Sequence, residues 1–274
     1  MNNILSAITS LLTTQASIVR VSIVDVGKGD CILVQAGNSA VLIDTGYKKT
    51  AADALAHMRE QGVDRLDAMI ITHYDRDHVD GMSKIGAGID IDAVYLPGYE
   101  GSDDNYDSCV ASAAGIDAPT RHVTKKLVIP LGEARLTVYP PCVAYVPANG
   151  YEEGNDNDVS LVATLINGHD SFLFAGDLEQ EGIDAFLATE AGRRHYDVLK
   201  MPHHGQHESN TADLLDTVRP KIAVITDSYK DPASKKTLKL LDKADAETYC
   251  TSYDGTVVIE SNGTGSYQVR TEAE

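Results

Sequence analysis

The sequence has few cysteines, and none of them are paired at a metal-binding or disulfide spacing. Its four cysteines, Cys31, Cys109, Cys142 and Cys250, are widely separated and form no CxxC motif. This pattern excludes a zinc ribbon and argues against a disulfide framework, so reduced thiols in a cytoplasmic protein are expected. No apolar run reaches the length of a membrane span.

The chain is also poor in basic residues. It has 23 Lys and Arg against 41 Asp and Glu, which gives a formal net charge of −18. Such a charge argues against tight, sequence-independent binding of duplex DNA or an anionic membrane by the free chain. The most basic stretch, "KDPASKKTLK" at 230–239, falls on an expected late helix and is interpreted as a solvated face.

The first 17 residues lack the basic region of a signal peptide, because no Lys or Arg precedes Arg20. Their apolar residues recur at helical spacing, which predicts an amphipathic helix over 1–17. We expect this helix to pack on the domain, and docking to a partner is the alternative. Residues 18–274 are interpreted as one domain.

From residue 18, short β-rich runs alternate with helical stretches. The expected strands are 18–26, 31–36, 40–44, 67–72, 159–166, 171–177, 196–201, 221–226, 256–260 and 266–270. The expected helices cover 51–61, 178–191, 212–218 and 234–243, whereas 97–119 and 140–157 look loop-rich. Two hairpin-plus-helix halves predict an α/β fold in which two sheets pack face to face with helices outside, not a doubly wound parallel sheet.

The stretch "THYDRDH" places four potential metal ligands directly after an apolar strand. His73 and Asp75 can point to one side of the strand-to-helix turn, and Asp77 and His78 to a neighbouring position. This arrangement suits two metal ions better than one, and a solvated polar turn is the alternative. Histidine and carboxylate side chains are the usual ligands of such ions.

Two later strands also end in potential ligands. "FLFAGD" ends in Asp177, and "VLKMPHHG" ends in His203 and His204. A carboxylate at the end of a buried strand is costly unless it is paired or bound to a cation. Three strands that end in His or Asp therefore predict a metal site at one edge of the sandwich.

These motifs, with "DVGKGD", "LIDTG" and "NDVSLV", occur in the order found in the metallo-β-lactamase-fold hydrolases. The chain most resembles the C-terminal hydrolase domain of the bacterial competence DNA-uptake channel protein and its stand-alone relatives, over about Val21 to Thr226. The resemblance implies a metallo-β-lactamase-like αββα sandwich of two mixed sheets with helices on the outer faces. It also implies two divalent metal ions, Zn²⁺ or Mn²⁺.

The resemblance further implies a role for each ligand. His73 and Asp75 would bind the first metal, and Asp77 and His78 the second. Asp177 would bridge the two metals. Either His203 or His204 would complete the second site, the other lying outside the first ring of ligands.

Catalytic and supporting roles follow from the same resemblance. Asp77 would also orient the metal-activated hydroxide, and either a site histidine, for which His204 is the candidate, or a metal-bound water would protonate the leaving group. The residues expected to support the ligands or contact substrate are Asp44, Asp30, Asn157, Ser160, Tyr74 and His207.

The chain departs from the family pattern at two places near the metals. Many members have His where this chain has Asp75, which makes the first site richer in oxygen and shifts its preference from Zn²⁺ toward Mn²⁺. The usual separate histidine is not evident, and the chain reads Asn157-Asp158-Val159-Ser160 at about that point.

Three functions remain open from sequence. The first is a phosphodiesterase or nuclease, acting on a small phosphodiester or on nucleic acid presented by a partner. The second is an ester-type hydrolase of a lactone or thioester, which would need an apolar substrate pocket. The third is a non-catalytic metal-binding module that docks through its N-terminal helix. Fold alone does not decide between substrates.

Overall fold

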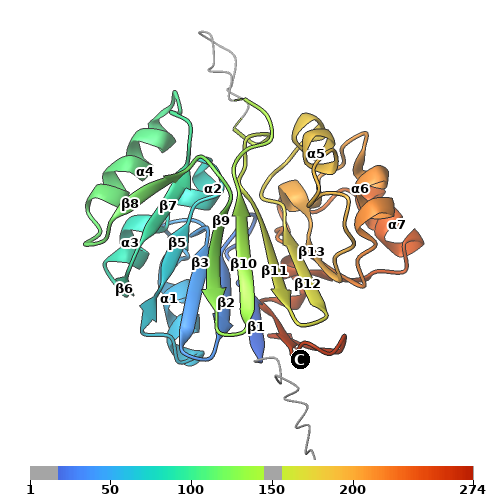
Figure 1. Cartoon of the computed structure of the whole chain (residues 1–274), viewed down its shortest axis with the longest axis horizontal. Helices are drawn as coiled ribbons and strands as arrows, with labels where there is room; N and C mark the ends of the chain where they lie inside the picture. Colours follow the sequence, from blue (N-terminus) through green and yellow to red (C-terminus); the bar gives the residue numbers. More distant parts are fainter. Residues whose placement is uncertain (1–17, 145–155, 274) are drawn as a thin grey trace, which may run out of the picture.

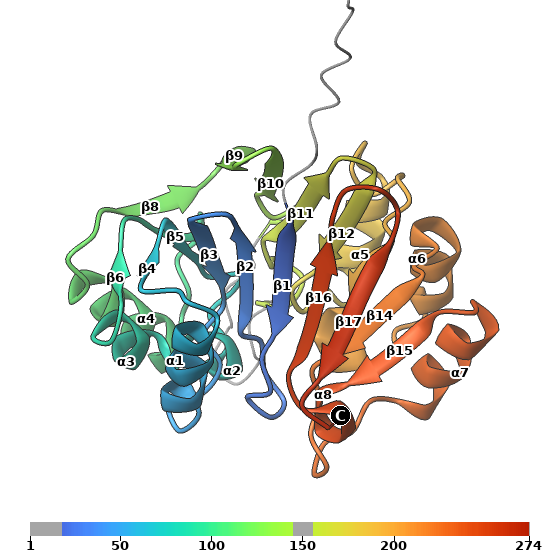
Figure 2. The ribbon, with the colours of Figure 1, turned by 90° about the horizontal axis from the view of Figure 1, so that it is seen from below.

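Two mixed β-sheets lie face to face, and helices cover the outer side of each (Figures 1 and 2). The computed structural model describes residues 18–144 and 156–273, so the helix predicted over 1–17 lies outside the described residues. The predicted αββα sandwich is confirmed. Among the described residues, no helix combines the length and the apolar character needed to cross a bilayer.

The first sheet has the strand order β17-β16-β1-β2-β3-β5-β7-β8. Its strands are β1 Val19–Ile23, β2 Ile32–Ala36, β3 Ser39–Ile43, β5 Ala68–Ile70, β7 Val94–Pro97, β8 Thr120–Val123, β16 Val257–Ser261 and β17 Tyr267–Thr271. A separate two-stranded sheet pairs β4 (Arg65–Leu66) with β6 (Asp90–Ile91). The helices that accompany this half are α1 Ala51–Glu60, α2 Arg76–Val79, α3 Met82–Gly86 and α4 Asp104–Ala114.

The second sheet has the order β15-β14-β13-β12-β11-β10-β9. Its strands are β9 Leu127–Leu131, β10 Ala134–Tyr139, β11 Val162–Asn167, β12 Asp170–Phe174, β13 Val198–Lys200, β14 Ile222–Ile225 and β15 Glu247–Cys250. The helices of this half are α5 Gln180–Leu187, α6 Thr211–Val218, α7 Lys235–Lys243 and the short α8 Thr251–Asp254, with a 3₁₀ turn, η1, at Pro202–Gly205.

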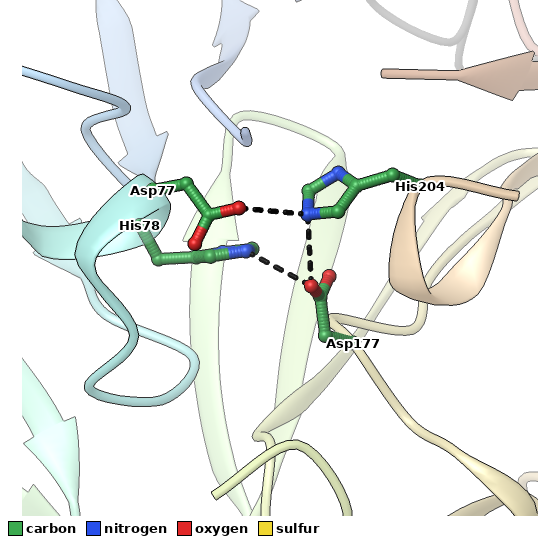
Figure 3. Close-up of side chains that lie close together, drawn as sticks. All are labelled: Asp77, His78, Asp177 and His204. Carbon is green, nitrogen blue, oxygen red and sulfur yellow. Dashed lines mark ion pairs between the residues drawn. The ribbon is translucent and has the colours of Figure 1, made fainter. Parts of the chain in front are cut away.

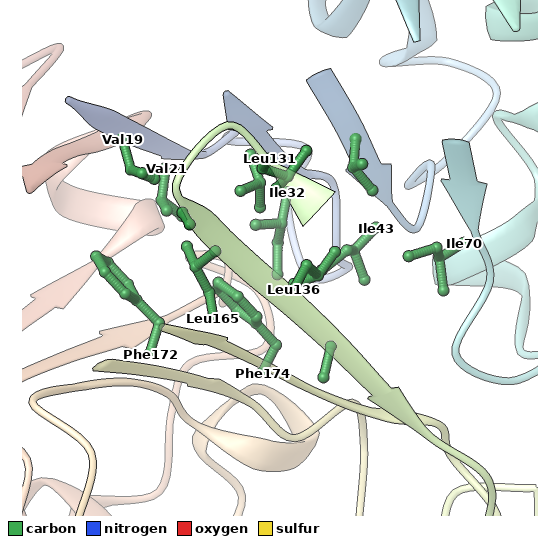
Figure 4. Packing of buried hydrophobic residues seen from close by; sticks show 14 of the residues in the cluster. Val19, Val21, Ile32, Ile43, Ile70, Leu131, Leu136, Leu165, Phe172 and Phe174 are labelled. Atoms are coloured by element: carbon green, nitrogen blue, oxygen red, sulfur yellow. The ribbon is translucent and has the colours of Figure 1, made fainter. Parts of the chain in front are cut away.

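Three apolar layers hold this arrangement together. Alternate residues of each strand point to opposite faces, so Val19 and Val21 of β1 meet Phe172 and Phe174 of β12 between the sheets (Figure 4). The opposite faces pack against the helices, α1, α3 and α4 on one side and α5, α6 and α7 on the other. Each fully buried Val, Leu, Ile or Phe contributes about 1.5–3 kcal/mol relative to exposure, so all three layers stabilise the sandwich.

One prediction about the secondary structure is wrong. Residues 97–119 contain the helix α4 and are not a continuous loop. The Asp103 side chain accepts hydrogen bonds from the backbone N–H groups of Asn105 and Tyr106, which starts the helix. The helix buries only Cys109 and Ala113, so its apolar stripe was too narrow to stand out in the sequence.

The strand directions bring the predicted ligands to a common edge. β3 and β5 are parallel, and so are β12, β13 and β14, so the carboxyl ends within each set share an edge. A hydrogen bond from the Leu161 N–H to the Thr72 carbonyl, at 2.8 Å, joins the two edges. The residues that follow these strands therefore meet between the sheets.

Candidate metal centre

Four of the predicted ligands converge at this edge. We call Asp77, His78, Asp177 and His204 the ligand cluster; one donor atom from each lies within 4.8 Å of the others. Asp177 Oδ2 lies 3.2 Å from His78 Nε2 and 2.8 Å from His204 Nε2, and Asp77 Oδ2 lies 3.3 Å from His204 Nε2 (Figure 3). The four side chains come from both halves of the sandwich, which is the convergence that the sequence predicts.

Local backbone geometry aims the first two ligands. The helix α2 begins at Arg76, so Asp77 and His78 lie in its first turn. The backbone N–H and the hydroxyl of Thr45, just after β3, both donate to the His78 carbonyl at 2.8 Å. The "GKGD" turn approaches from the other side, and a Cβ on Gly29 would lie 2.6 Å from the Asp77 carbonyl oxygen. Only glycine allows this approach.

The backbone also separates the two neighbouring histidines of "PHHG". His203 and His204 both have left-handed φ angles, of 46° and 52°. His204 is buried and points to Asp177, whereas His203 Nδ1 lies 3.3 Å from Glu179 Oε1, in a separate group with Glu208. The sequence left open which of these two histidines is a ligand. The structure places His204, and not His203, in the ligand cluster.

Hydrogen bonds fix the ring nitrogens of His78. Asp44 is fully buried, and its carboxylate accepts bonds from the Thr72 N–H at 2.8 Å and the Thr72 hydroxyl at 2.7 Å. The same carboxylate lies 2.8 Å from His78 Nδ1. Since a carboxylate only accepts hydrogen bonds, Nδ1 carries a proton, so Nε2 is the nitrogen available to a metal.

The same reasoning applies to the other two histidines. The Thr72 hydroxyl donates its one proton to Asp44, so it accepts from His73 Nδ1, 3.0 Å away. The Thr226 hydroxyl donates to Asp30 at 2.7 Å, so it accepts from His204 Nδ1 at 2.9 Å. Asp44 thus contacts His78 directly, and Asp30 contacts His204 through Thr226.

The three free Nε2 atoms fit a divalent metal. Those of His73, His78 and His204 are buried and make no hydrogen bond of normal geometry among the described residues. A buried polar atom without a partner is costly. Histidines that bind a metal through one ring nitrogen typically donate a hydrogen bond from the other, as these three do. Together with the carboxylates of Asp77 and Asp177, these nitrogen and oxygen donors form a set that can hold a divalent metal.

A buried lysine balances part of the negative charge. The Lys200 ammonium forms an ion pair with Asp30 and lies 3.4 Å from Asp177 Oδ1 and 3.1 Å from the Gly176 carbonyl oxygen. Burial lowers the pKa of Lys200, but Asp30 and Asp177 outweigh burial and raise it overall. Lys200 is therefore a permanent cation at the base of the site.

The protein's own charges hold protons on the cluster histidines. Burial lowers the pKa of His78, yet Asp177 and Asp44 raise it well above its ordinary value, and Asp177 likewise raises that of His204. Burial raises the pKa of Asp77, but the neighbouring histidines lower it overall. In the metal-free protein, these shifts favour a second proton on Nε2 of both cluster histidines, and a metal must displace that proton to bind there.

The residues predicted for the first metal lie beside the cluster. The rings of His73 and His78 are 4.1 Å apart, and His73 Nε2 lies 3.8 Å from Asp75 Oδ2. Burial first, and then His78, lowers the pKa of His73 to about 4, which keeps this ring neutral at pH 7. Within residues 18–144 and 156–273, no third His, Cys or carboxylate has a donor atom within 4.8 Å of those of both His73 and Asp75.

Two of the remaining predicted site residues lie near the cluster. The Ser160 hydroxyl accepts a hydrogen bond from the Asp177 N–H at 3.1 Å and donates to the Asn157 carbonyl at 2.7 Å. The Asn157 side chain donates to Glu179 at 2.9 Å. Ser160 thus orients Asp177, and Asn157 connects with the His203 side of the site.

The two other predicted residues do not reach the cluster. The Tyr74 ring is fully buried among Tyr99 and Tyr106, and its hydroxyl donates to the Pro97 carbonyl at 3.2 Å. Tyr74 follows the end of β5, and its ring packs in the apolar layer between the first sheet and its helices, away from the ligand cluster where a contact with substrate was expected. No hydrogen bond or ion pair among the described residues joins the half-buried His207 to the cluster.

Lys200 and Thr226 were missed in the sequence. The signal for Lys200 was a lysine inside the apolar run "DVLKM", where a charge is costly unless it is paired. Thr226 gave no such signal, because threonine is common at the end of a strand.

Comparisons with known proteins agree with this geometry. Two curated relatives are ComE operon protein 3 of Bacillus subtilis, 25% identical over 91% of this chain, and Competence protein ComA of Neisseria gonorrhoeae, 26% identical over 76%. The chain spans only 34% and 27% of their lengths. A third, Recombination protein 2 of Haemophilus influenzae, is 26% identical over 78% of this chain and 25% of its own length.

Solved structures show the same fold. The metallo-beta-lactamase fold protein YhfI from Bacillus subtilis superposes with a TM-score of 0.58 at 12% identity, over 89% of this chain and all of that one. PqqB from Methylobacterium extorquens, in a Zn²⁺-bound structure, gives 0.53 at 13% identity over 83% of this chain and 86% of its own. The family profile of the metallo-beta-lactamase superfamily matches residues 24–226. The chain belongs to this superfamily and is a metal-dependent hydrolase.

Proposed function

We propose that the chain is a phosphodiesterase of nuclease type that uses two divalent ions, Zn²⁺ or Mn²⁺. The observation that carries the proposal is the ligand cluster, in which two carboxylates and two free Nε2 atoms meet in a buried, preorganised position. The cluster residues would hold one ion. His73 and Asp75, with Asp177 shared between the two sites, would hold the other.

Bound ions of this kind supply a nucleophile by lowering the pKa of water, and they polarise the oxygens of the substrate. The protein's own residues prepare that chemistry. Asp44 and Thr226 keep each histidine in one tautomer, and Lys200 neutralises the carboxylates beneath the cluster without occupying the free Nε2 atoms. This preorganisation avoids rearrangement during the reaction.

The cluster opens on the side of Asp77. The Asp77 side chain is 16% exposed, whereas those of His78, His204 and Asp177 are 0%, 1% and 3% exposed. A substrate therefore reaches the cluster past Asp77, which fits the catalytic role expected for this residue.

Charge and kinship favour a phosphodiester as the substrate. Three of the proposed ligands are carboxylates, and hard oxygen ligands suit Mn²⁺ and phosphate chemistry. One relative is Recombination protein 2, and recombination is a process that involves nucleic acid. With a net charge of −18, the free chain suits a small phosphodiester or a strand presented by a partner better than a tightly held duplex.

One observation favours ester hydrolysis as a second candidate. A pocket of about 250 Å³ is lined by mainly apolar residues that include Tyr99, Val123 and Val159. Burial raises the pKa of the Tyr99 hydroxyl most, and Asp156, Tyr74 and then Asp75 add to it, which places Tyr99 near the Asp75 carboxylate. An apolar acyl group of a lactone or thioester would fit such a pocket.

Hydrolysis of bis(p-nitrophenyl) phosphate tests the proposal. Metal-stripped protein reloaded with Zn²⁺ or Mn²⁺ should hydrolyse it, and the Asp77→Asn variant should be folded but inactive. A homoserine lactone and an acyl thioester serve as competing substrates. Turnover of either ester with none of the phosphodiester would replace the proposal by the second candidate.

A further inference from the structure

A basic pocket lies beside the ligand cluster. It has a volume of about 770 Å³ and is lined by Tyr47, Lys48, Lys49, Arg76, Asp80 and Lys84, which we call the cationic pocket. These residues come from the segment between β3 and α1, from α2 and its end, and from α3. Figure 2 shows α1, α2 and α3 grouped on the same side of the first sheet.

The pocket has an excess of positive charge. Arg76 Nε lies 3.6 Å from Asp80 Oδ2, and the same oxygen accepts a hydrogen bond from the Lys48 backbone N–H at 3.1 Å. Among the described residues, no carboxylate forms an ion pair with the ammonium groups of Lys48, Lys49 or Lys84. Four cations thus face one carboxylate, in a chain where acids outnumber bases by 41 to 23.

The pocket and the ligand cluster share the helix α2. Arg76 lines the pocket and directly precedes Asp77, the most exposed member of the cluster. Tyr47 lies between the pocket and the cluster. On the pocket side, Lys49 Nζ is 5.0 Å from the centre of the Tyr47 ring. On the cluster side, Asp77 adds to the effect of burial and raises the pKa of the Tyr47 hydroxyl. A ligand in the pocket therefore lies next to the open side of the cluster.

We propose that the cationic pocket binds a backbone phosphate of a single nucleic-acid strand, adjacent to the phosphodiester that lies at the ligand cluster. The assignment of a strand rests on the proposed function. Unpaired lysines near an aromatic ring form the kind of groove that follows a single-stranded backbone. The acidic remainder of the surface repels the second strand of a duplex, and so restricts contact to this face.

The test compares two variants that lose the same three charges. The pocket variant is Lys48→Gln/Lys49→Gln/Lys84→Gln, and Arg76 is kept because it adjoins a cluster ligand. The control variant is Lys235→Gln/Lys236→Gln/Lys239→Gln, which removes exposed lysines from α7. Fluorescence anisotropy with a labelled twelve-residue oligothymidylate measures binding to the full chain in EDTA, and bis(p-nitrophenyl) phosphate measures turnover of the metal-loaded protein.

The pocket variant should bind the oligonucleotide at least tenfold more weakly, whereas the control variant should stay within twofold of the natural chain. The slope of log K against log salt should become shallower by about 0.7, because one phosphate contact of a single strand is lost. Turnover of bis(p-nitrophenyl) phosphate should be equal in all three proteins, since this substrate has only one phosphate.

Two results would overturn the inference. One is equal weakening in the two variants, which would show a general charge effect. The other is displacement of the oligonucleotide by thymidine monophosphate at the same concentration of phosphate groups, which would show a site for free phosphate. Absence of turnover with normal oligonucleotide binding would refute the proposed function and leave the pocket as assigned.

Discussion

The Asp44→Asn substitution should weaken metal binding without changing any metal ligand. Asp44 accepts three hydrogen bonds, two from Thr72 and one from His78 Nδ1. The asparagine amide has only one oxygen, so its NH₂ group must face a donor. If it faces His78, the ring proton must move to Nε2, which removes the lone pair from the ligand cluster. Asparagine tolerates the left-handed φ of 58° at this position, so the backbone should not change.

Loss of such a supporting hydrogen bond typically lowers metal affinity by about 10–100-fold, or about 1.4–2.8 kcal/mol. Competition with a chromogenic chelator for Zn²⁺ measures this change. The Asp170→Asn variant is the matched control, because Asp170 is equally buried and accepts hydrogen bonds from Ser261 and Gly263 away from the site. Zinc affinity within twofold of the natural chain in Asp44→Asn would refute the tautomer assignment.

Three further outcomes are expected. Lys200→Met removes the ammonium that pairs with the buried carboxylates of Asp30 and Asp177, and it should lower the free energy of unfolding of the metal-free protein by about 3–5 kcal/mol in urea; a loss below 1 kcal/mol would show that the ion pair is not stabilising. Gly81→Ala would place a Cβ 2.2 Å from the Thr45 carbonyl oxygen and should lower the free energy of unfolding by about 1–3 kcal/mol. Gly115→Ala is the control, because a Cβ has room there, and thermal melts of both variants should show that it is nearly neutral. Because the pKa values of the two cluster histidines are raised, metal binding at pH 7 should release more than one proton, as calorimetry in buffers of different ionisation enthalpy would show; no release would contradict their protonation.

The sequence predicted the fold because its signals were strong and local. Apolar runs of strand length ended repeatedly in polar residues, and the structure places those ends at one edge. The strands expected over 159–166 and 171–177 correspond to β11 and β12, which form an antiparallel pair with Asn167 opposite Asp170. The helix α4 was missed because most of its residues are polar and exposed.

The choice between His203 and His204 lay beyond sequence reasoning. Both residues have left-handed backbone angles, so neither helical nor strand periodicity predicts where their side chains point. The supporting hydrogen bonds depend on long-range packing as well. Thr226 and Asp30 are 196 residues apart in the chain, and they meet only when the two sheets pack together.

The most direct test of the proposed function is a metal titration. Metal is added stepwise to the metal-stripped protein, and turnover of bis(p-nitrophenyl) phosphate is measured at each addition. Turnover should rise with the bound metal, saturate at two equivalents per chain, and disappear in Asp177→Asn together with the tightly bound metal. Turnover that persists in excess EDTA, or that Asp177→Asn retains in full, would contradict a hydrolytic metal centre built on the ligand cluster.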